Sequence, residues 1–229
     1  LLTGEARSAT ARAVRDTDLL RLDKAVFDQL VEEQPSVMMQ VTRRMVTRYQ
    51  AVLRTKGRPA RGALATLALI PCGADVPMAA FCERFEAALS RVRSVLRVNS
   101  QRVDAALGEG AAQTPRDHSR NSTLVAWLME QETKFDLVLY EADAKRTAWT
   151  SRCIRQADRV LLVGADHVSP DLGPIETAMR RDGADGTAVG RELVLLHREP
   201  RDVYPGTSAW LASRRLDRHH HVVMDSPSD

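Results

Sequence analysis

Two positions in the sequence have residue types that could bind the phosphates and the metal ion of a nucleotide. The turn "PCGADVP" follows the apolar segment "LATLALIP", and the apolar segment "FDLVLYEAD" ends at Asp143. In parallel α/β folds, phosphate binds to backbone N–H groups in the turn after a strand, and a carboxylate after another strand can organise magnesium. Gly73 and Asp75 in the turn, with Asp143, are therefore candidate nucleotide-binding residues.

The turn lacks most of what a phosphate-binding loop requires. Such a loop needs several glycines for convergent N–H groups, a lysine that reaches the phosphates and a serine or threonine for magnesium. The turn contains Gly73 alone, and Asp75 would repel an anion. We therefore predict a connecting turn in which nucleotide is not hydrolysed, and Asp143 is then a residue that caps the turn after its strand. Nucleotide binding by this part of the chain remains an alternative.

Other catalytic and metal-binding patterns are incomplete. A nucleophile elbow requires G-x-S-x-G, but in "GTSAW" Trp210 replaces the second glycine, so Ser208 is predicted to begin a helix. The run His219 to His221 is predicted to lie on a partly exposed terminal strand, where adjacent histidines point to opposite faces. Three cysteines without C-x-x-C spacing indicate neither a disulfide framework nor a zinc site. The sequence therefore predicts no catalytic residue, metal or cofactor.

Composition excludes further classes. The 33 basic and 30 acidic residues are mixed along the chain and aromatic residues make up 4%, a pattern that does not favour nucleic-acid binding. No apolar run approaches the roughly 20 residues that cross a bilayer. We expect a cytoplasmic protein without a transmembrane segment.

The elements that would position these residues begin at residue 64. From there, apolar segments alternate with helical patterns of 10 to 15 residues, which predicts an α/β domain over 64–229 with a mostly parallel sheet and helices on both faces. The segment "RTKGRPARGA", residues 54–63, has the composition of a linker. Before it, helices are predicted over 24–34 and 36–53, after two alternating, strand-like stretches within residues 4–22.

The helical stretch "TAWTSRCIRQA" and the aspartate after it provide a second candidate site. Helical spacing puts Trp149, Cys153 and Ala157 on one face. We predict that the polar residues around that face form an exposed nucleotide-binding or interaction surface, made of Trp149, Thr150, Arg152, Arg155, Gln156 and Asp158. The alternative is that Trp149 packs in the core and the arginines are solvated.

The opening of the chain resembles one part of a cyclic-nucleotide-binding domain. "ARSATARAVRDTDLLRL" is similar to the end of its phosphate-binding cassette and its last strands. The resemblance implies that Arg7 pairs with the cyclic phosphate, with Ser8, Ala9 and Thr10 beside it, and that the two following helices are hinge and lid. Glu5 falls in the variable loop before the arginine. Residues 1–53 are thus expected to be the C-terminal part of such a domain, and its front β-roll is expected to be missing.

The remaining sequence resembles the middle region of bacterial members of the neuropathy-target-esterase family of patatin-like phospholipases. The most specific stretch is "VLYEADAKRTAWTSRCIRQADRVLLVG", supported by "WLMEQETKFD", "LGPIE" and "ELVLLHRE". The resemblance implies a degenerate domain like that of P-loop nucleotide hydrolases, followed by a patatin catalytic domain. The "DGADG" at 182–186 lies too early to be that domain's Asp-Gly partner.

The resemblance implies a regulatory role. The chain is expected to be the non-catalytic portion of a lysophospholipase or esterase, connecting cyclic-nucleotide sensing to a downstream patatin domain. Phospholipid would be bound only through that domain, and the full-length parent is expected at the membrane periphery. The alternative is a stand-alone signalling or adaptor module related to cyclic-nucleotide-dependent regulators.

Overall fold

The computed structural model describes residues 21–34, 64–181 and 190–224. The chain divides into two compact units, Leu1–Ala63 and Leu64–Asp229. The proposed cyclic-nucleotide contacts Arg7, Ser8, Ala9 and Thr10, the predicted helix 36–53 and the predicted linker 54–63 all lie outside the described residues.

The described part of the smaller unit is one helix, α1 (Lys24–Glu33), where a helix over 24–34 was predicted. Asp23 precedes it in an extended conformation and receives a hydrogen bond from Arg21 at 3.0 Å. Among its apolar side chains, Leu30 and Val31 are half-buried, while Val26 is exposed.

The larger unit is built on a six-stranded sheet whose pairs are all parallel, in the order β2-β3-β1-β4-β5-β6. The strands are β1 (Thr66–Pro71), β2 (Val95–Val98), β3 (Leu137–Glu141), β4 (Arg159–Ala165), β5 (Gly190–His197) and β6 (Arg218–Val223). The helices are α3 (Met78–Ser90), α4 (Ser100–Leu107), α5 (Asn121–Lys134), α6 (Ala148–Gln156), α7 (Pro174–Arg181) and α8 (Thr207–Ala212), with the short 3-10 turn η1 (Ala111–Gln113). The predicted parallel α/β fold is confirmed.

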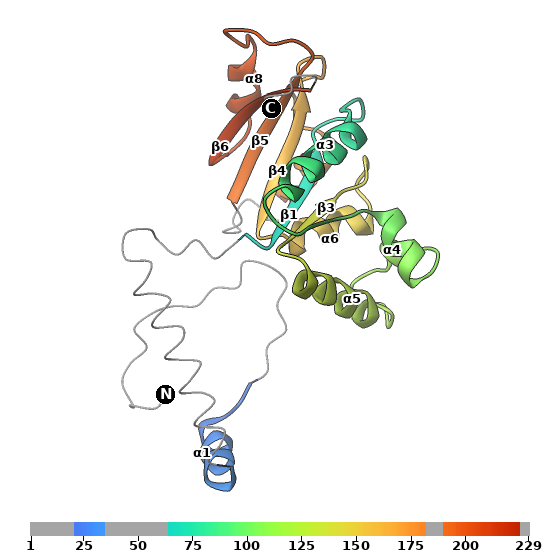
Figure 1. Ribbon diagram of the computed structural model, residues 1–229, viewed down its shortest axis with the longest axis vertical. Helices are drawn as coiled ribbons and strands as arrows, with labels where there is room; N and C mark the ends of the chain where they lie inside the picture. The colour runs from blue at the N-terminus through green and yellow to red at the C-terminus, as the bar shows by residue number, and fades with distance from the viewer. Residues whose placement is uncertain (1–20, 35–63, 182–189, 225–229) are drawn as a thin grey trace. The chain divides into compact units, whose positions relative to one another are not determined.

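Helices cover both faces of the sheet, but unequally (Figure 1). Phe81 and Cys82 of α3 pack in one core cluster with Leu69 of β1. The opposite cluster contains Ile70 of β1 with buried side chains from α4, α5, α6, α7 and α8, among them Trp149. The connection from β1 to β2 runs one way along the sheet and all later connections run the other way. Because parallel crossovers are right-handed, α3 must lie on the face opposite the later helices.

The side chains of β1 show why a continuous apolar run forms a central strand. All six residues of β1 are buried, since neighbouring side chains alternate between the two clusters.

Cys72, Cys82 and Cys153 are buried free thiols. Within the described part of the chain, no helix combines the length and the apolar character needed to cross a membrane.

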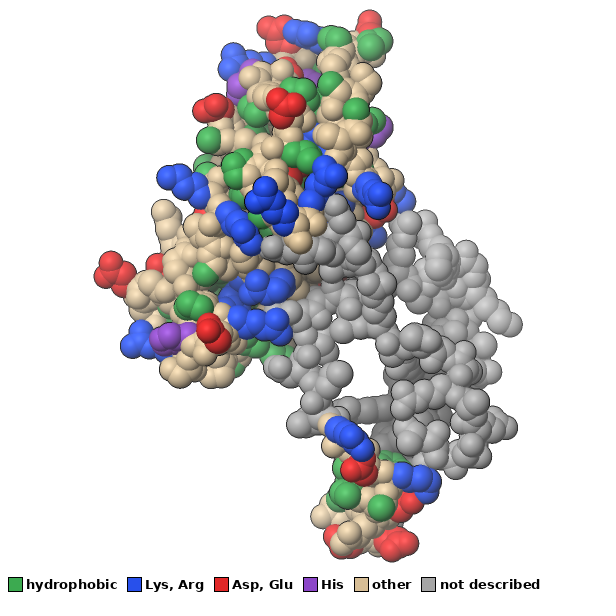
Figure 2. All heavy atoms as spheres, turned by 180° about the vertical axis from the view of Figure 1, so that it is seen from behind, with side chains coloured by type: hydrophobic (Ala, Val, Ile, Leu, Met, Phe, Trp, Pro, Cys, Tyr) green, Lys and Arg blue, Asp and Glu red, His purple; other side chains and the backbone are tan. Residues whose placement is uncertain are grey.

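Charged side chains are distributed over the surface of the larger unit. In the view from behind, Lys and Arg side chains gather across its middle (Figure 2). The strand ends and loops at the sheet's carboxyl edge contain three of the predicted site residues, Gly73, Asp75 and Asp143.

Candidate functional site

The turn after β1 is closed by backbone contacts and by packing. The Cys72 N–H donates to the Val163 carbonyl at 2.9 Å, and the Met78 N–H donates to the Val76 carbonyl at 2.7 Å. A Cβ atom added to Gly73 would lie 2.8 Å from Cγ1 of Val168, so that side chain already occupies the space beside the glycine. Asp75 is exposed. This turn is therefore a packed connection, as the sequence indicated, with a carboxylate at its exposed tip.

Asp143 lies two residues beyond β3, and its carboxylate accepts three side-chain hydrogen bonds. The donors are Ser100 Oγ at 2.7 Å, Gln113 Nε2 at 3.0 Å and Thr147 Oγ1 at 2.6 Å. Thr147 in turn accepts the backbone N–H of Thr150 and so caps α6. The carboxylate thus ties together the start of α4, the η1 turn and the start of α6.

The predicted exposed surface on α6 is wrong for four of its residues. Trp149, Thr150, Arg152 and Gln156 are buried. The helix packs its Trp149 face on the sheet, and the indole Nε1 donates to the Glu141 carbonyl at 2.8 Å. Arg152 donates to the Thr114 carbonyl at 3.1 Å and to Asn121 Oδ1 at 2.6 Å. The alternative with Trp149 in the core is confirmed, but Arg152 is a buried structural side chain rather than a solvated one.

Arg155 and Asp158 are half-buried, and Asp158 lies at the opposite edge of the sheet from Asp143. Its Oδ2 accepts the N–H groups of Ala65 and Thr66 at 3.1 and 3.0 Å, and its own N–H donates to Thr66 Oγ1 at 2.8 Å. Asp158 precedes β4, whereas Gly73, Asp75 and Asp143 follow β1 and β3. Because the strands are parallel, the predicted site residues are divided between two edges.

A group that the sequence reasoning missed lies at the carboxyl ends of β4, β5 and β6. His197 Nε2 lies 2.8 Å from His221 Nδ1, and His197 Nδ1 lies 3.5 Å from Asp166 Oδ2. The Tyr204 ring stacks on His197 with ring centroids 3.8 Å apart, and on His221 at 4.7 Å. The sequence did contain a signal for this group, because Asp166 directly follows β4 and His197 is the last residue of β5. Among the described residues, no group of three or more His, Cys, Asp or Glu is placed to hold a metal ion.

Burial sets the ionisation of this group. It lowers the pKa of His197, although the Asp166 carboxylate acts in the opposite direction. Burial also lowers the pKa of His221, and the neighbouring His197 lowers it further. Burial opposes the ionisation of Asp166, but the hydrogen bond from His167 and the charge of His197 outweigh it, so that its pKa is lowered. The folded chain therefore favours two neutral imidazoles beside one carboxylate.

This arrangement predicts that the larger unit loses stability as the pH falls. Because the folded state binds protons on His197 and His221 less readily than the unfolded state, their contribution is complete above the ordinary histidine pKa of 6.5 and is lost below it. Urea unfolding measured between about pH 7.5 and about pH 5 should show this loss. The free energy of unfolding should depend less steeply on pH for His197→Gln than for the wild type. His118→Gln, which changes an exposed histidine elsewhere, should retain the wild-type slope. Equal slopes for all three proteins would contradict the prediction.

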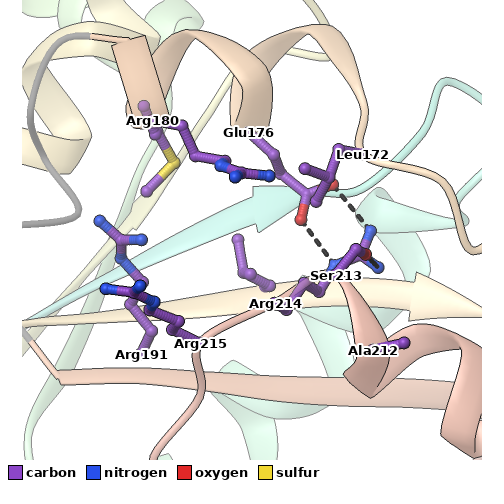
Figure 3. Close-up of a pocket in the computed structure, with 10 residues that line it drawn as sticks. Leu172, Glu176, Arg180, Arg191, Ala212, Ser213, Arg214 and Arg215 are labelled. Carbon is purple, nitrogen blue, oxygen red and sulfur yellow. Dashed lines mark hydrogen bonds and ion pairs between the residues drawn. The ribbon is translucent and has the colours of Figure 1, made fainter.

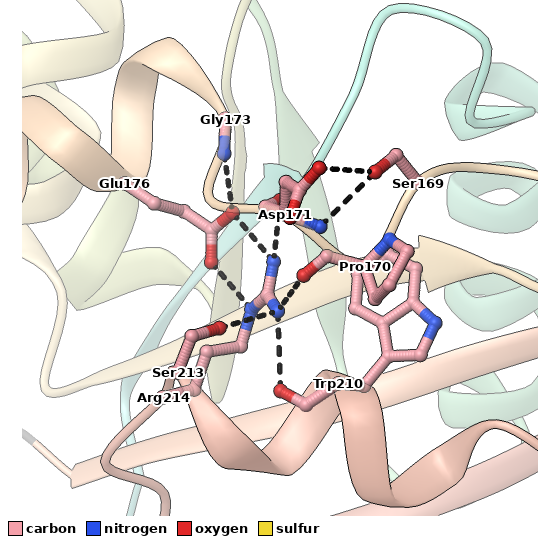
Figure 4. A network of polar contacts seen from close by, with 8 residues as sticks. All are labelled: Ser169, Pro170, Asp171, Gly173, Glu176, Trp210, Ser213 and Arg214. Atoms are coloured by element: carbon pink, nitrogen blue, oxygen red, sulfur yellow. Dashed lines mark hydrogen bonds and ion pairs between the residues drawn. The ribbon is translucent and has the colours of Figure 1, made fainter.

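A buried ion pair joins α7 to the segment after α8 (Figure 4). Arg214 Nε donates to Glu176 Oε1 at 2.7 Å and Arg214 Nη2 donates to Oε2 at 2.9 Å, with side chains only 2% and 5% exposed. The guanidinium also donates to the carbonyls of Pro170 and Trp210. Glu176 Oε2 additionally accepts the Gly173 N–H at 3.0 Å.

The ion pair also contacts the turn after β1. Burial raises the pKa of the Cys72 thiol, and Glu176 adds to the effect. A Cβ on Gly173 would lie 2.8 Å from the Cys72 carbonyl oxygen, so the close approach of the two backbones requires glycine there. The carboxyl edge on this side is therefore filled by interlocking structural contacts.

Comparisons with known proteins agree with this architecture. Residues 63–228 match the family described as "Neuropathy Target Esterase family P-loop like domain". The chain is 34% identical to human patatin-like phospholipase domain-containing protein 6 over 93% of its length, which is 16% of that protein. It is 31% identical to the neuropathy target esterase sws of Drosophila grimshawi, with 97% of the chain and 16% of that protein covered.

A third relative, patatin-like phospholipase domain-containing protein ZK370.4 of Caenorhabditis elegans, is 31% identical over 97% of the chain and 17% of its own length. The chain therefore spans about a sixth of the length of the curated relatives that it matches. The family match covers the whole of the parallel sheet, from β1 to β6. The chain belongs to the neuropathy target esterase family of patatin-like phospholipase proteins, and its larger unit is the P-loop-like domain of that family.

Proposed function

We propose that this chain is the non-catalytic, regulatory part of a patatin-like phospholipase, and that it connects a cyclic-nucleotide-binding unit to a downstream serine-hydrolase domain. The main support for this proposal comes from the hydrogen bonds that the Asp143 carboxylate accepts. Its position after β3 is that of a magnesium-organising carboxylate, but its oxygens accept hydrogen bonds from Ser100, Gln113 and Thr147. A carboxylate that accepts three hydrogen bonds from neutral donors on different elements stabilises loops and helix starts.

The closed turn after β1 supports the same proposal. Nucleotide hydrolysis needs a glycine-rich turn with converging N–H groups at this point, and here Val168 packs beside Gly73, the one glycine of the turn. A domain built in this way is suited to holding neighbouring units in place. The cyclic nucleotide would bind at Arg7 to Thr10, and lipid would be bound by the downstream domain.

Ester hydrolysis provides the test. The purified chain should not cleave lysophospholipid or a short-chain ester above the buffer rate, because Ser208 is an exposed residue in the first turn of the six-residue helix α8 rather than in a strand-to-helix elbow. A longer product of the same gene that includes codons beyond Asp229 should carry a G-x-S-x-G serine and hydrolyse these esters. Esterase activity of the chain alone that disappears in Ser208→Ala would contradict the proposal.

A further inference from the structure

A single side chain anchors the connection between β5 and α8. Residues 198–206 form this connection, and all of them are exposed except Tyr204, which is half-buried. The Tyr204 ring stacks on two histidines, with ring centroids 3.8 Å from His197 and 4.7 Å from His221. The packing of the connection against the sheet therefore depends on these two imidazoles.

The elements on either side of the connection are held in place without Tyr204. On one side, β5 is paired with both β4 and β6. On the other side, Trp210 of α8 is buried, and Arg214 after the helix forms its ion pair with Glu176 (Figure 3). A loss of the Tyr204 contact can therefore be confined to residues 198–206, while the sheet and α8 stay folded.

The contact between the two histidines requires one ring nitrogen that carries no proton. His197 Nε2 and His221 Nδ1 lie 2.8 Å apart, so one of these nitrogens donates a hydrogen bond and the other accepts it. One of the two histidines can be protonated without loss of this hydrogen bond, because the cation donates to its neutral neighbour. When both are protonated, every ring nitrogen carries a proton, and repulsion between two like charges replaces the hydrogen bond.

Among the described residues, one carboxylate and several basic side chains surround the histidine pair. The carboxylate is Asp166 after β4, whose Oδ2 lies 3.5 Å from His197 Nδ1. The basic side chains that act on the pair or on Asp166 are Arg201 of the connection, His167 after β4, and His219 and His220 of β6. Asp166 can balance one positive charge on the pair, but the second charge would meet further basic groups.

We propose that His197, His221 and Tyr204 form a pH-sensitive latch, which holds residues 198–206 against the sheet and releases them when both histidines are protonated. The second proton separates the two imidazoles, and the surface on which the Tyr204 ring stacks is lost. Release of this exposed connection precedes unfolding of the sheet, so it is distinct from the loss of global stability described above. The proposal does not depend on the regulatory role proposed for the chain.

The direction of the pH dependence follows from the burial of the pair. Burial lowers the pKa of both His197 and His221 below the ordinary value of 6.5. Both imidazoles are therefore not protonated together at neutral pH, and the latch is closed there. It opens as the pH falls below that ordinary value.

NMR spectra of the purified chain with ¹³C-labelled tyrosine rings test the latch. The chain has three tyrosines, and Tyr140 is fully buried in β3, so its signals report whether the sheet is folded. Between about pH 7.5 and about pH 5, the Tyr204 signals should move toward the positions of an exposed tyrosine, while the Tyr140 signals keep their native positions. Tyr204→Phe identifies the Tyr204 signals.

Two substitutions of His221 remove the second proton. His221→Phe keeps an aromatic ring beside Tyr204, and His221→Gln keeps a hydrogen-bonding group beside His197. In either protein the Tyr204 signals should stay close to their neutral-pH positions down to about pH 5. The matched control is His219→Gln, at an exposed histidine two residues earlier in β6, which should keep the wild-type movement.

Three results would overturn the proposal. The wild-type Tyr204 signals could stay in place over the whole pH range, or they could move only together with the Tyr140 signals, which would indicate unfolding of the whole unit. They could also move in a folded His221 variant as far as in the wild type. The first two results come from the wild-type chain, so the test stands even if both His221 variants fail to fold.

Discussion

Replacing Glu176 by alanine should lower the free energy of unfolding of the larger unit by about 3–5 kcal/mol, since the change leaves Arg214 charged and buried without its partner. The Arg214 side chain is only 2% exposed, so water cannot solvate the unpaired charge without local opening. In a unit of this size, a loss of 3 kcal/mol corresponds to a fall in Tm of about 6–12 °C. Glu176→Gln keeps the shape and one acceptor and should have a smaller effect.

The control for this experiment is an exposed ion pair in the same unit. Glu130 Oε1 and Lys134 Nζ lie 2.7 Å apart on α5, and both side chains are 56% exposed. Glu130→Ala should change stability by no more than about 0.5 kcal/mol, because exposed pairs contribute little. If Glu176→Ala and Glu130→Ala lower the Tm and the free energy of unfolding in urea equally, the buried pair does not have the structural role assigned to it.

Asp143→Ala should also lower the free energy of unfolding, by about 2–3 kcal/mol, although Asp143 stands where a nucleotide hydrolase would have a magnesium-organising carboxylate. The substitution removes the acceptor for the hydroxyls of Ser100 and Thr147 and for the amide of Gln113 at once. The starts of α4 and α6 then lose their common contact, and amide exchange in both helices should become faster.

Asp117, which is exposed in the loop before α5, provides the matched control. Asp117→Ala should leave the free energy of unfolding within about 0.5 kcal/mol of the wild type, as is usual for surface substitutions. If Asp143→Ala is equally well tolerated, its hydrogen bonds are not what holds the carboxyl edge together.

The sequence was sufficient to predict the sheet because the signal for a buried parallel strand is local. "TLALIP" and "RVLLVGA" are continuous apolar runs, and they form the adjacent central strands β1 and β4. The glycine after α4 is a local signal of the same kind, since Gly108 ends that helix with φ at 101°. Ser208 in the first turn of α8 was predicted from its neighbours alone.

The site was predicted less well because its contacts join distant segments. The donors to Asp143 include Ser100 and Gln113, which lie 43 and 30 residues away in the chain. The polar residues of α6 were predicted to be exposed from their types and helical spacing, but the acceptors of Arg152 lie 38 and 31 residues away in the chain, and Arg152 is buried. The partners in the Glu176–Arg214 pair are likewise 38 residues apart. Only the folded arrangement shows which polar side chain has a buried partner.

The larger unit is the P-loop-like domain of its family, and we propose that its carboxyl edge does not hydrolyse nucleotides. The most direct test is the release of inorganic phosphate from ATP and GTP by the purified chain in the presence of Mg²⁺, measured beside Asp143→Asn. We expect release at the buffer rate for both proteins, because Val168 packs beside Gly73 and the Asp143 carboxylate accepts three hydrogen bonds from neutral donors. Phosphate release that requires Mg²⁺ and is abolished by Asp143→Asn would show that this edge of the sheet does catalyse nucleotide hydrolysis.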